Sequence, residues 1–392
     1  MESPPLAPRC GSTQFEAMSS APIGLNDFAR QWADTAPAVL EAVRQVGESG
    51  WYILGPEVSQ FEEALAARLG RRFAVGCASG LDAIEISLRA LGLKAGEKVL
   101  TTPFSAFATT LAILRAGGRP VFVDVDQSGL VDLDRARDAC TRDSSIRYLV
   151  PVHLFGHPCN LEGLGTLKSR FHLKVVEDCA QAIGAYSGEH AVGSVGNLSA
   201  LSFYPTKNLG ALGDGGAVVT DDGLLAETCR NLRDYGQTAK YVHDLRGLNS
   251  RLDELHAAIL GRAFLPKLAS WMERRQRIAE QYLQGIRNPS VRIVPVPSSC
   301  RPAWHLFPVL IEPGRREAFC KHLQDGGVRT GIHYPMIIPR QKALGDRSVF
   351  DVVGELTRAD AFAAGEVSLP IHAYLRDDEL DAIVSKINAW KP

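Results

Sequence analysis

The 392-residue chain has no excess of charge of either sign. Lysine and arginine together number 43 and aspartate and glutamate 44, which gives a formal net charge of -1. A chain with this balance has no broad basic field to attract nucleic acid or an anionic membrane. We therefore expect no nucleic-acid partner and no membrane partner, and any anionic ligand must be bound by local groups.

Long apolar runs and paired cysteines are also missing. No segment approaches the ~20 consecutive apolar residues that a membrane span needs, and residues 1–22 lack the apolar core of a signal peptide. The eight cysteines include no Cys-x-x-Cys pair, which argues against a zinc site or a disulfide scaffold and favours buried, reduced thiols. The sequence predicts a cytoplasmic protein without a metal site, with a flexible tail over residues 1–22.

The chain contains neither the G-x-x-x-x-G-K-[ST] nor the G-x-G-x-x-G fingerprint, which excludes the common nucleoside-triphosphate and dinucleotide sites. What it does contain is an ordinary globular composition of 45% hydrophobic and 22% charged residues, with 36 glycines and 22 prolines. At roughly 150 residues per domain, this length suggests two or three domains.

Seven short runs rich in Val, Ile and Leu alternate with helical patterns between residues 73 and 220. Such alternation is typical of a mostly parallel sheet whose strands are joined by crossover helices. The expected strands are residues 74–77, 98–102, 120–125, 147–154, 174–178, 200–204 and 217–220. Helical patterns at 224–233 and from 250 to about 285 complete a large domain over residues 23–287.

A proline-containing linker begins near residue 288 and leads into a second region. Strands are expected there at 304–311 and 328–333, and helices at 315–324 and 377–390. Residues 288–392 are thus predicted to form a small α/β domain that packs against the large one.

The segment Val-Gly-Cys-Ala-Ser-Gly-Leu-Asp-Ala, residues 75–83, joins an expected strand to a helix through small residues. Free backbone N–H groups at the start of the helix, its dipole and the hydroxyl of Ser79 could together bind a phosphate. A glycine turn between strand and helix is also how most α/β units connect, so a purely structural role stays open at this point.

Asp178 ends the apolar strand 174–178. Parallel strands present functional groups at their carboxyl ends, so Asp178 stands where an α/β enzyme would place a catalytic acid. Held against a protonated ring nitrogen, its carboxylate would form a charge-assisted hydrogen bond and keep the ring electron-withdrawing. The alternative is that Asp178 caps a following helix.

Lys207 follows another apolar strand and is surrounded by apolar and hydroxyl residues, with four glycines in the seven positions from 210 to 216. A solvated surface charge is not expected in such surroundings. Desolvation would lower the pKa of Lys207 and make its amine a nucleophile suited to Schiff-base chemistry. A surface lysine whose stem packs on apolar neighbours is the alternative.

These motifs, in this order and at this spacing, resemble the DegT/StrS-type sugar aminotransferases, which depend on pyridoxal 5'-phosphate. The resemblance covers roughly residues 50 to 390. Its most specific block is 202–216, and the other blocks are 55–58, 151–156, 177–181, 249–254 and 331–335.

The resemblance implies an α/β fold of the aspartate-aminotransferase type (fold type I). A large domain with a seven-stranded, mostly parallel sheet would be joined by a small C-terminal α/β domain, in a homodimer with shared active sites. The catalytic residues would be Lys207, which bonds the cofactor and later moves a proton, and Asp178, which pairs with the pyridine nitrogen.

The resemblance also implies which residues bind the cofactor and the substrate. Gln181 would approach the ring hydroxyl, and Asn249 would reach the phosphate of the partner subunit's cofactor. The phosphate of the subunit's own cofactor would be held by Ser79, Gly80, Leu81 and Ser202, and the substrate would be contacted by Tyr204, His333 and Tyr334.

Two positions depart from the family pattern. Ala106 stands where family members usually have an aromatic residue that stacks on the cofactor ring, so either Phe104 or Phe107 stacks instead or the ring face is less covered. Leu81 stands where many relatives have a phosphate-binding threonine, and leucine has no side-chain donor.

The resemblance implies a ping-pong transamination in which L-glutamate converts the cofactor to its pyridoxamine form, which then aminates a nucleotide-linked keto-deoxysugar. Residues 80–83 together with 50–55 are more similar to the branch that acts on 3-oxo, dTDP-linked sugars than to the 4-oxo branch. The alternatives are a 4-oxo sugar aminotransferase, a related dehydratase with histidine at the position of Lys207, and a non-catalytic regulator of the same fold. The histidines at 153, 157, 243 and 305 are expected to be core or interface residues with one hydrogen bond each.

Overall fold

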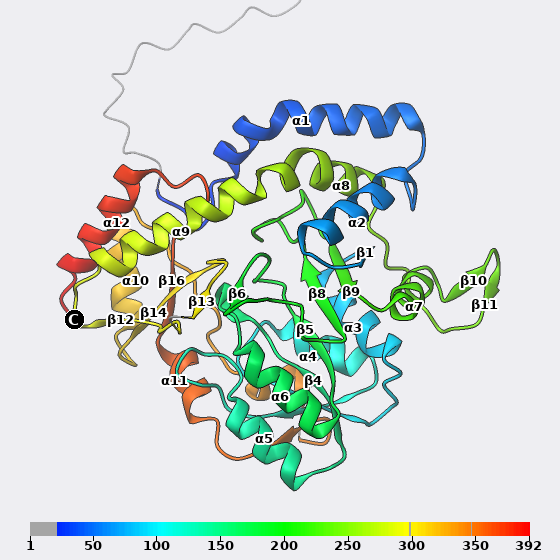
Figure 1. Cartoon of the computed structure of the whole chain (residues 1–392). Coiled ribbons are helices and arrows are strands. Elements are labelled where there is room, and N and C mark those ends of the chain that lie inside the picture. The colour runs from blue at the N-terminus through cyan, green and yellow to red at the C-terminus, as the bar shows by residue number, and fades with distance from the viewer. Residues whose placement is uncertain (1–21, 298, 346) are drawn as a thin grey trace, which may run out of the picture.

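The computed structural model describes residues 22–297, 299–345 and 347–392. The chain folds around an eight-stranded sheet with the strand order β1-β9-β8-β5-β4-β2-β3-β15 (Figure 1). The strands are β1 (Phe73–Cys77), β2 (Lys98–Thr101), β3 (Arg119–Phe122), β4 (Ile146–Val150), β5 (Lys174–Asp178), β8 (Leu198–Ser202), β9 (Gly216–Thr220) and β15 (Asp351–Val352). Within this sheet β9 alone runs antiparallel to its neighbours.

All seven strands expected between residues 73 and 220 are present, although their ends differ from the prediction by up to four residues. The eighth strand, β15, pairs with β3 at the edge of the sheet and comes from the region assigned to the small domain. It is only two residues long, too short to leave a periodic pattern in the sequence.

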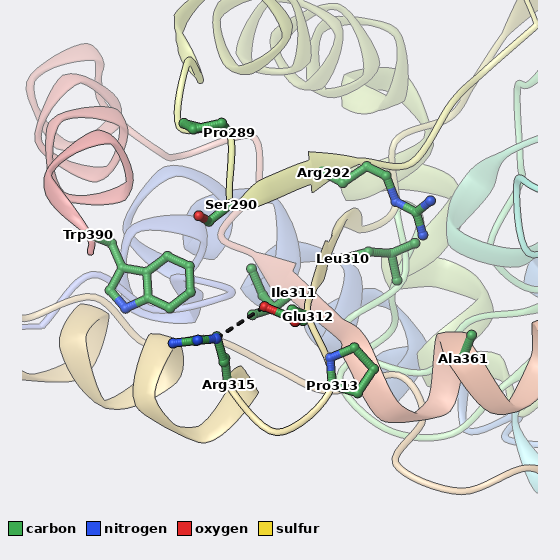
Figure 2. A pocket seen from close by; sticks show the side chains of 10 residues that line it. All are labelled: Pro289, Ser290, Arg292, Leu310, Ile311, Glu312, Pro313, Arg315, Ala361 and Trp390. Atoms are coloured by element: carbon green, nitrogen blue, oxygen red, sulfur yellow. Dashed lines mark hydrogen bonds and ion pairs between the residues drawn. The ribbon is translucent and has the colours of Figure 1, made fainter. Parts of the chain in front are cut away.

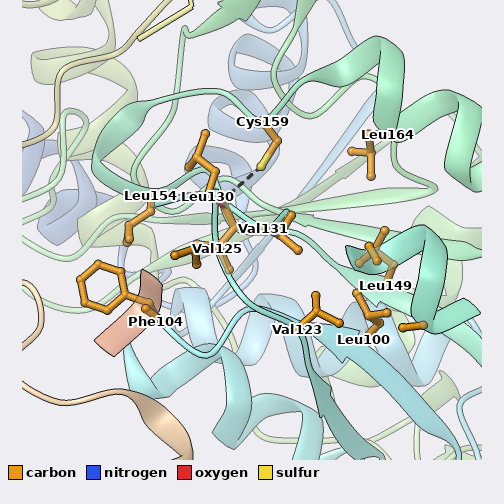
Figure 3. Packing of buried hydrophobic residues seen from close by; sticks show 14 of the residues in the cluster. Leu100, Phe104, Val123, Val125, Leu130, Val131, Leu149, Leu154, Cys159 and Leu164 are labelled. Carbon is orange, nitrogen blue, oxygen red and sulfur yellow. Dashed lines mark hydrogen bonds between the residues drawn. The ribbon is translucent and has the colours of Figure 1, made fainter. Parts of the chain in front are cut away.

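The sheet is covered on both faces, as the consecutive apolar residues of its strands predict. Leu149 and Val175 pack into one core cluster together with residues of α5 (Leu133–Arg142) and α6 (Leu161–Phe171). Figure 3 shows Leu149 in this cluster, beside Leu100 and Val123. Tyr148 and Val176, one position away in each strand, pack into the opposite cluster with α3 (Gly80–Ala90) and α7 (Gly223–Arg233). A further helix, α4 (Phe107–Arg115), contacts α3.

Two long helical segments lie above the sheet in Figure 1. One consists of α1 (Phe28–Ser49), and the other runs through α8 (Glu254–Ala258), a π-helical turn (Ile259–Phe264), a 3-10 turn (Leu265–Lys267) and α9 (Leu268–Gly285). Between them and the sheet lies α2 (Pro56–Arg68), whose first N–H groups are bound by a side chain of α8. Oε1 of Glu254 accepts hydrogen bonds from the N–H groups of Gly55 and Val58, and Oε2 accepts one from Glu57. This contact brings two of the family-like blocks, 55–58 and 249–254, together.

The C-terminal region contains a three-stranded antiparallel sheet of β12 (Val291–Ile293), β14 (Phe307–Ile311) and β16 (Glu366–Leu369). Its core cluster includes residues of α9, α10 (Arg316–Asp325) and α12 (Asp377–Ala389). A helix at α11 (Thr357–Gly365) leads into β16. The expected strand at 328–333 is wrong: Val328 and Gly331 make only single bridges, with Ile23 and Ser368.

The predicted domain boundary at residue 288 stays a prediction, because strands from before and after this residue pair with one another in the same sheets. Besides β15 in the large sheet, β13 (Cys300–Arg301) pairs with β6 (Tyr186–Ser187). The predicted tail at residues 1–22 lies outside the described residues except for its last residue. The remaining elements are β7 (His190–Ala191), β10 (Gln237–Ala239), β11 (Val242–His243) and 3-10 turns at Leu154–Gly156, Ile338–Arg340 and Lys342–Leu344. Among the described residues, none of the helices combines the length and the apolarity that a membrane crossing requires.

Candidate active site

A cavity of about 260 Å³ lies at the carboxyl ends of β5 and β8, beside the start of α3. This edge is where open α/β sheets bind their ligands. Eight of the predicted site residues line the cavity: Ser79, Gly80, Leu81, Asp178, Gln181, Ser202, Tyr204 and Lys207. The fold thus brings together residues that lie up to 128 positions apart (79 to 207) in the chain.

Lys207 follows β8 and its side chain lies in the cavity wall, only partly exposed. Burial disfavours the ammonium form and lowers the pKa of Lys207 to about 8, although the negative charge of Asp178 acts in the opposite direction. A lysine with such a pKa carries a substantial fraction of neutral amine near physiological pH. The alternative of a solvated surface lysine is therefore not supported.

Asp178 is buried at the end of β5 and is held by two hydrogen bonds. Its Oδ2 accepts from the hydroxyl of Thr109 at 2.8 Å, and its Oδ1 accepts from the N–H of Ala180 at 3.1 Å. Burial raises the pKa of Asp178, while these hydrogen bonds and the charge of Lys207 oppose the rise. The residues after Asp178 form turns rather than a helix, so the helix-capping alternative is wrong.

The start of α3 forms a cradle for an anion. Ser79 is the N-cap and accepts a hydrogen bond from the N–H of Asp82 at 3.1 Å, whereas the N–H groups of Gly80 and Leu81 make none with any described residue. A Cβ at Gly80 would lie 2.6 Å from the Cβ of Ser202, so only glycine keeps this space open. Free N–H groups at the positive end of a helix, beside two serine hydroxyls, are suited to a phosphate.

The other predicted residues lie at different distances from this cavity. Gln181 accepts a hydrogen bond from the N–H of Phe155 at 2.6 Å, and its Nε2 lies 3.5 Å from the hydroxyl of Tyr334. His333 packs edge-on against Tyr334, with ring centroids 5.6 Å apart. Asn249 is exposed outside the cavity, where it forms a single bridge with Asp234. The contact predicted for Asn249 is with a partner subunit.

The structure favours one of the alternatives for the missing aromatic residue. Ala106 lines the cavity, whereas Phe104 is buried in the core against Phe155 and Phe107 packs against the cluster around Phe122. Neither phenylalanine is among the residues that line the cavity, so a less covered ring face is the alternative that remains.

Sequence reasoning missed two hydroxyl residues of the same segment. Ser105 and Thr109 both line the cavity, and their hydroxyl oxygens lie 3.2 Å apart. Ser105 lies two positions before α4, which begins at Phe107, and Thr109 lies in the first turn of that helix. The sequence shows two hydroxyl residues close together here, but no pattern that identifies Asp178 as their partner.

A buried cluster of possible metal ligands, His153, Glu177 and Cys179, lies beside the cavity. Nε2 of His153 lies 3.0 Å from Oε2 of Glu177, and Nδ1 of His153 accepts from the N–H of Cys159. Glu177 also accepts three backbone N–H bonds from the loop 193–196, so the ligand atoms already have protein partners. His153 thus makes two hydrogen bonds where one was expected. His157 departs in the other direction, since neither of its buried ring nitrogens has a partner among the described residues.

A separate cavity of about 370 Å³ lies in the C-terminal region, between β12, the end of β14 and Trp390 (Figure 2). Arg315 and Glu312 form an ion pair of 3.1 Å at its edge. None of the predicted site residues lines it. Both the amine and the anion cradle are in the cavity at β5 and β8, which is therefore the candidate active site.

The residues at this cavity fit pyridoxal phosphate. The cradle at Gly80 matches its phosphate, Asp178 matches its basic ring nitrogen, and the amine of Lys207 matches its aldehyde. A largely parallel α/β sheet with this set of groups at its strand ends defines a pyridoxal-phosphate-dependent enzyme of fold type I.

Comparison with known proteins identifies the enzyme more closely. The model of the DegT/DnrJ/EryC1/StrS aminotransferase family matches residues 34–388, and the chain belongs to this family. It is an aminotransferase.

Three relatives illustrate the similarity. The erythromycin biosynthesis sensory transduction protein EryC1 of Saccharopolyspora erythraea is 41% identical over 89% of this chain and 94% of its own. The dTDP-3-amino-3,4,6-trideoxy-alpha-D-glucose transaminase of Streptomyces venezuelae is 39% identical over 89% of this chain and 91% of its own. The crystal structure of S. venezuelae DesV in complex with a ketimine intermediate superposes with a TM-score of 0.88 at 38% identity, covering 94% of this chain and 98% of that one.

Proposed function

We propose that this enzyme transfers an amino group from L-glutamate to the 3-oxo carbon of a dTDP-linked deoxysugar. The observation that carries the proposal is the cavity in which Lys207, with its pKa lowered to about 8, Asp178 and the cradle at Gly80 occur together. Amino transfer needs these three elements: an amine, an acid for the ring nitrogen and an anchor for the phosphate.

Each residue has a defined task in this reaction. When bound, pyridoxal phosphate supplies an electron sink that stabilises negative charge on the substrate carbon. Asp178, oriented by Thr109, keeps a proton on the ring nitrogen through a charge-assisted hydrogen bond. Nζ of Lys207, partly neutral near pH 8, takes a proton from the substrate carbon and returns one during the transfer. Ser79, Gly80, Leu81 and Ser202 would hold the phosphate, and Gln181 would approach the ring hydroxyl.

The sugar is expected to lie on the side of the cavity where Tyr204, His333 and Tyr334 occur. Tyr204 lines the cavity, and Tyr334 is connected to it through Gln181. The name of the S. venezuelae transaminase supports a dTDP-linked sugar aminated at carbon 3. A 4-oxo sugar is the main alternative substrate.

We further infer that the enzyme is a cytoplasmic homodimer whose active sites are shared between subunits. Trp51, Tyr52 and Tyr204 are 56%, 51% and 52% exposed, and large aromatic side chains left exposed in one subunit support a contact with another protein chain. Asn249, which lies outside its own cavity, would reach the phosphate in the partner's site. The described cysteines are all free thiols, which supports a reducing compartment.

The decisive experiment combines purified enzyme, pyridoxal phosphate, L-glutamate and a panel of 3-oxo and 4-oxo dTDP-sugars. We expect release of 2-oxoglutarate with the 3-oxo sugars, and its loss in Lys207→Ala. Release with 4-oxo sugars alone would overturn the proposed oxo position, and undiminished release by Lys207→Ala would overturn the proposed catalytic residue.

The name of EryC1 as a sensory transduction protein favours a regulator as the second candidate function. The presence of Lys207 opposes both this candidate and a dehydratase, which carries histidine there. Addition of L-glutamate to the yellow holoenzyme separates the candidates, because an aminotransferase loses the absorbance of its bound cofactor and a mere binding protein retains it.

A further inference from the structure

Beyond the cavity, three side chains form a hydrogen-bonded chain that leads from the small sheet toward the active site. Glu366 and Ser368 lie on β16, and both are fully buried. The hydroxyl of Ser368 donates to Oε1 of Glu366 at 2.6 Å, and Nδ1 of His333 lies 2.9 Å from the same hydroxyl. Oε2 of Glu366 accepts the backbone N–H of His333 at 2.5 Å.

His333 is connected to the active site through Tyr334. Its ring packs against Tyr334, whose hydroxyl lies 3.5 Å from Gln181 in the cavity wall. Burial, assisted by the positive charge of Lys207, lowers the pKa of His333 to about 4, so its imidazole is neutral at physiological pH. Nε2 of His333 makes no hydrogen bond with any described residue and is not a fully buried atom, so it is free to meet a ligand.

A neutral imidazole carries one N–H, and its two nitrogens have opposite roles. When Glu366 is ionised, the single proton of Ser368 points to the carboxylate, so the serine oxygen accepts from an N–H at Nδ1. Nε2 of His333 is then an acceptor. When Glu366 is protonated, it donates to the serine oxygen, Ser368 donates to Nδ1, and the imidazole proton is on Nε2, which becomes a donor.

We propose that Glu366 and Ser368 are positioning residues that set which ring nitrogen of His333 carries the proton, and so whether Nε2 accepts from or donates to a hydroxyl of the bound sugar. No proton is gained or lost by the imidazole in this exchange. The single proton bound or released belongs to Glu366. The part that concerns the sugar rests on the proposed function, whereas the coupling of the three side chains does not.

The change of tautomer at His333 is expected within the pH range in which the enzyme can be measured. Burial raises the pKa of Glu366 to about 8, against the hydrogen bonds from Ser368 and His333 and the charge of Arg316. The titratable and charged groups that act on Glu366 or His333 from neighbouring elements are Arg316 and Cys320 of α10, Tyr334, Lys207 and His305. Burial lowers the pKa of His305, and the positive charges of Lys207 and Arg275 act in the same direction, so His305 adds no positive charge.

The hydrogen bonds among Glu366, Ser368 and His333 do more than hold the backbone in place, because they determine which ring nitrogen of His333 carries the proton. A brace would fix the loop at residues 331–334 to β16 with one unchanging tautomer of His333. The arrangement observed here couples that tautomer to Glu366 through a hydroxyl that has a single proton. The tautomer is therefore the quantity to measure.

The test is NMR of holoenzyme labelled with 13C and 15N in its histidine rings, titrated from pH 6 to pH 9.5. The signals of His333 are assigned by their loss in His333→Gln. We expect the Nε2–H form of His333 below about pH 8 and the Nδ1–H form above it. Glu366→Gln should hold the Nε2–H form throughout, because its amide can only donate to Ser368 while its oxygen accepts from the His333 N–H.

Two results would overturn the proposal: a wild-type enzyme that keeps one tautomer of His333 over the whole range, or a Glu366→Gln variant that titrates like the wild type. If Glu366→Gln does not fold, the wild-type titration still decides. Ser368→Ala, which breaks the chain, should abolish the exchange, and Ser368→Thr, which keeps the hydroxyl, should restore it.

The same variants separate this proposal from the proposed function. If Nε2 of His333 contacts the sugar, the KM of the wild-type enzyme for the sugar should change near pH 8. Glu366→Gln should remove this change while kcat changes less than threefold. A tautomer exchange without any amino transfer to 3-oxo sugars would sink the proposed function and leave the coupling intact. If the wild-type enzyme transfers the amino group normally but His333 keeps one tautomer, the coupling is overturned and the proposed function stands.

Discussion

The hydroxyl of Thr109 donates a hydrogen bond of 2.8 Å to Oδ2 of Asp178. The two residues come from different elements, α4 and β5, and both line the active-site cavity. The bond orients the carboxylate and favours its ionised form, which opposes the rise in the pKa of Asp178 that burial causes.

Thr109→Val keeps the shape of this side chain and removes the hydroxyl. A hydrogen bond to a charged group contributes roughly 1.5–3 kcal/mol, so we expect kcat/KM to fall about 10- to 100-fold. Thr110→Val is the matched control, because the neighbouring hydroxyl is buried without a partner among the described residues. Equal losses in both variants would contradict a specific role for Thr109.

The pKa of Lys207 predicts how fast the apoenzyme binds pyridoxal phosphate at different pH. The amine must be neutral to attack the aldehyde, and burial lowers its pKa from 10.5 to about 8. The rate of attachment should therefore rise as pH increases and level off above about pH 8, whereas an ordinary lysine would still gain at pH 10. Stopped-flow absorbance measures this rate.

Asp178→Asn tests in which direction the charge of Asp178 shifts the pKa of Lys207. The negative charge of Asp178 raises the pKa of Lys207. Its removal should shift the midpoint of the attachment rate to lower pH, even though turnover falls. A shift to higher pH would mean that the charge of Asp178 does not act on Lys207.

Gly80→Ala tests the anion cradle. The added Cβ would lie 2.6 Å from the Cβ of Ser202 and 3.1 Å from its hydroxyl oxygen, so the space beside the free N–H groups would be filled. We expect the affinity for pyridoxal phosphate to fall at least tenfold, measured by equilibrium dialysis. Gly47→Ala is the control, since a Cβ at Gly47 in α1 meets nothing within 4 Å. A cradle placed elsewhere would leave both affinities unchanged.

The sequence sufficed for those parts of the site that local patterns determine. Asp178 ends one apolar strand and Lys207 follows another, and parallel strands of one sheet end at a common edge, so their proximity could be predicted. Ser79 and Gly80 were accessible for the same reason, because a strand, a glycine turn and a helix follow one another without interruption.

The contacts that were missed join segments far apart in the chain. Thr109 bonds Asp178 across 69 positions, and Ser368 meets His333 across 35, with no periodic pattern to connect them. The strand at 328–333 was wrongly expected because β-branched residues, here Val328, Thr330 and Ile332, favour a strand but do not supply a neighbouring strand. In the structure β16 pairs with β14 along its length, and its only backbone bridge with the described segment 328–333 is at Gly331.

Glu254 explains why the block at 55–58 and the block at 249–254 occur together. Its carboxylate accepts three N–H groups at the start of α2, from Gly55, Glu57 and Val58, each at 2.9 Å. Glu254→Gln replaces one acceptor oxygen with an amide that donates, so at least one buried N–H loses its partner. We expect a loss of about 2–3 kcal/mol in stability and a lower Tm, because a buried unsatisfied donor is costly. Glu57→Gln, which disturbs only the partly exposed pair with Arg262, should cost less than about 1 kcal/mol. Differential scanning calorimetry of the two apoenzymes measures the difference, and equal values of Tm would show that the carboxylate of Glu254 does not hold α2.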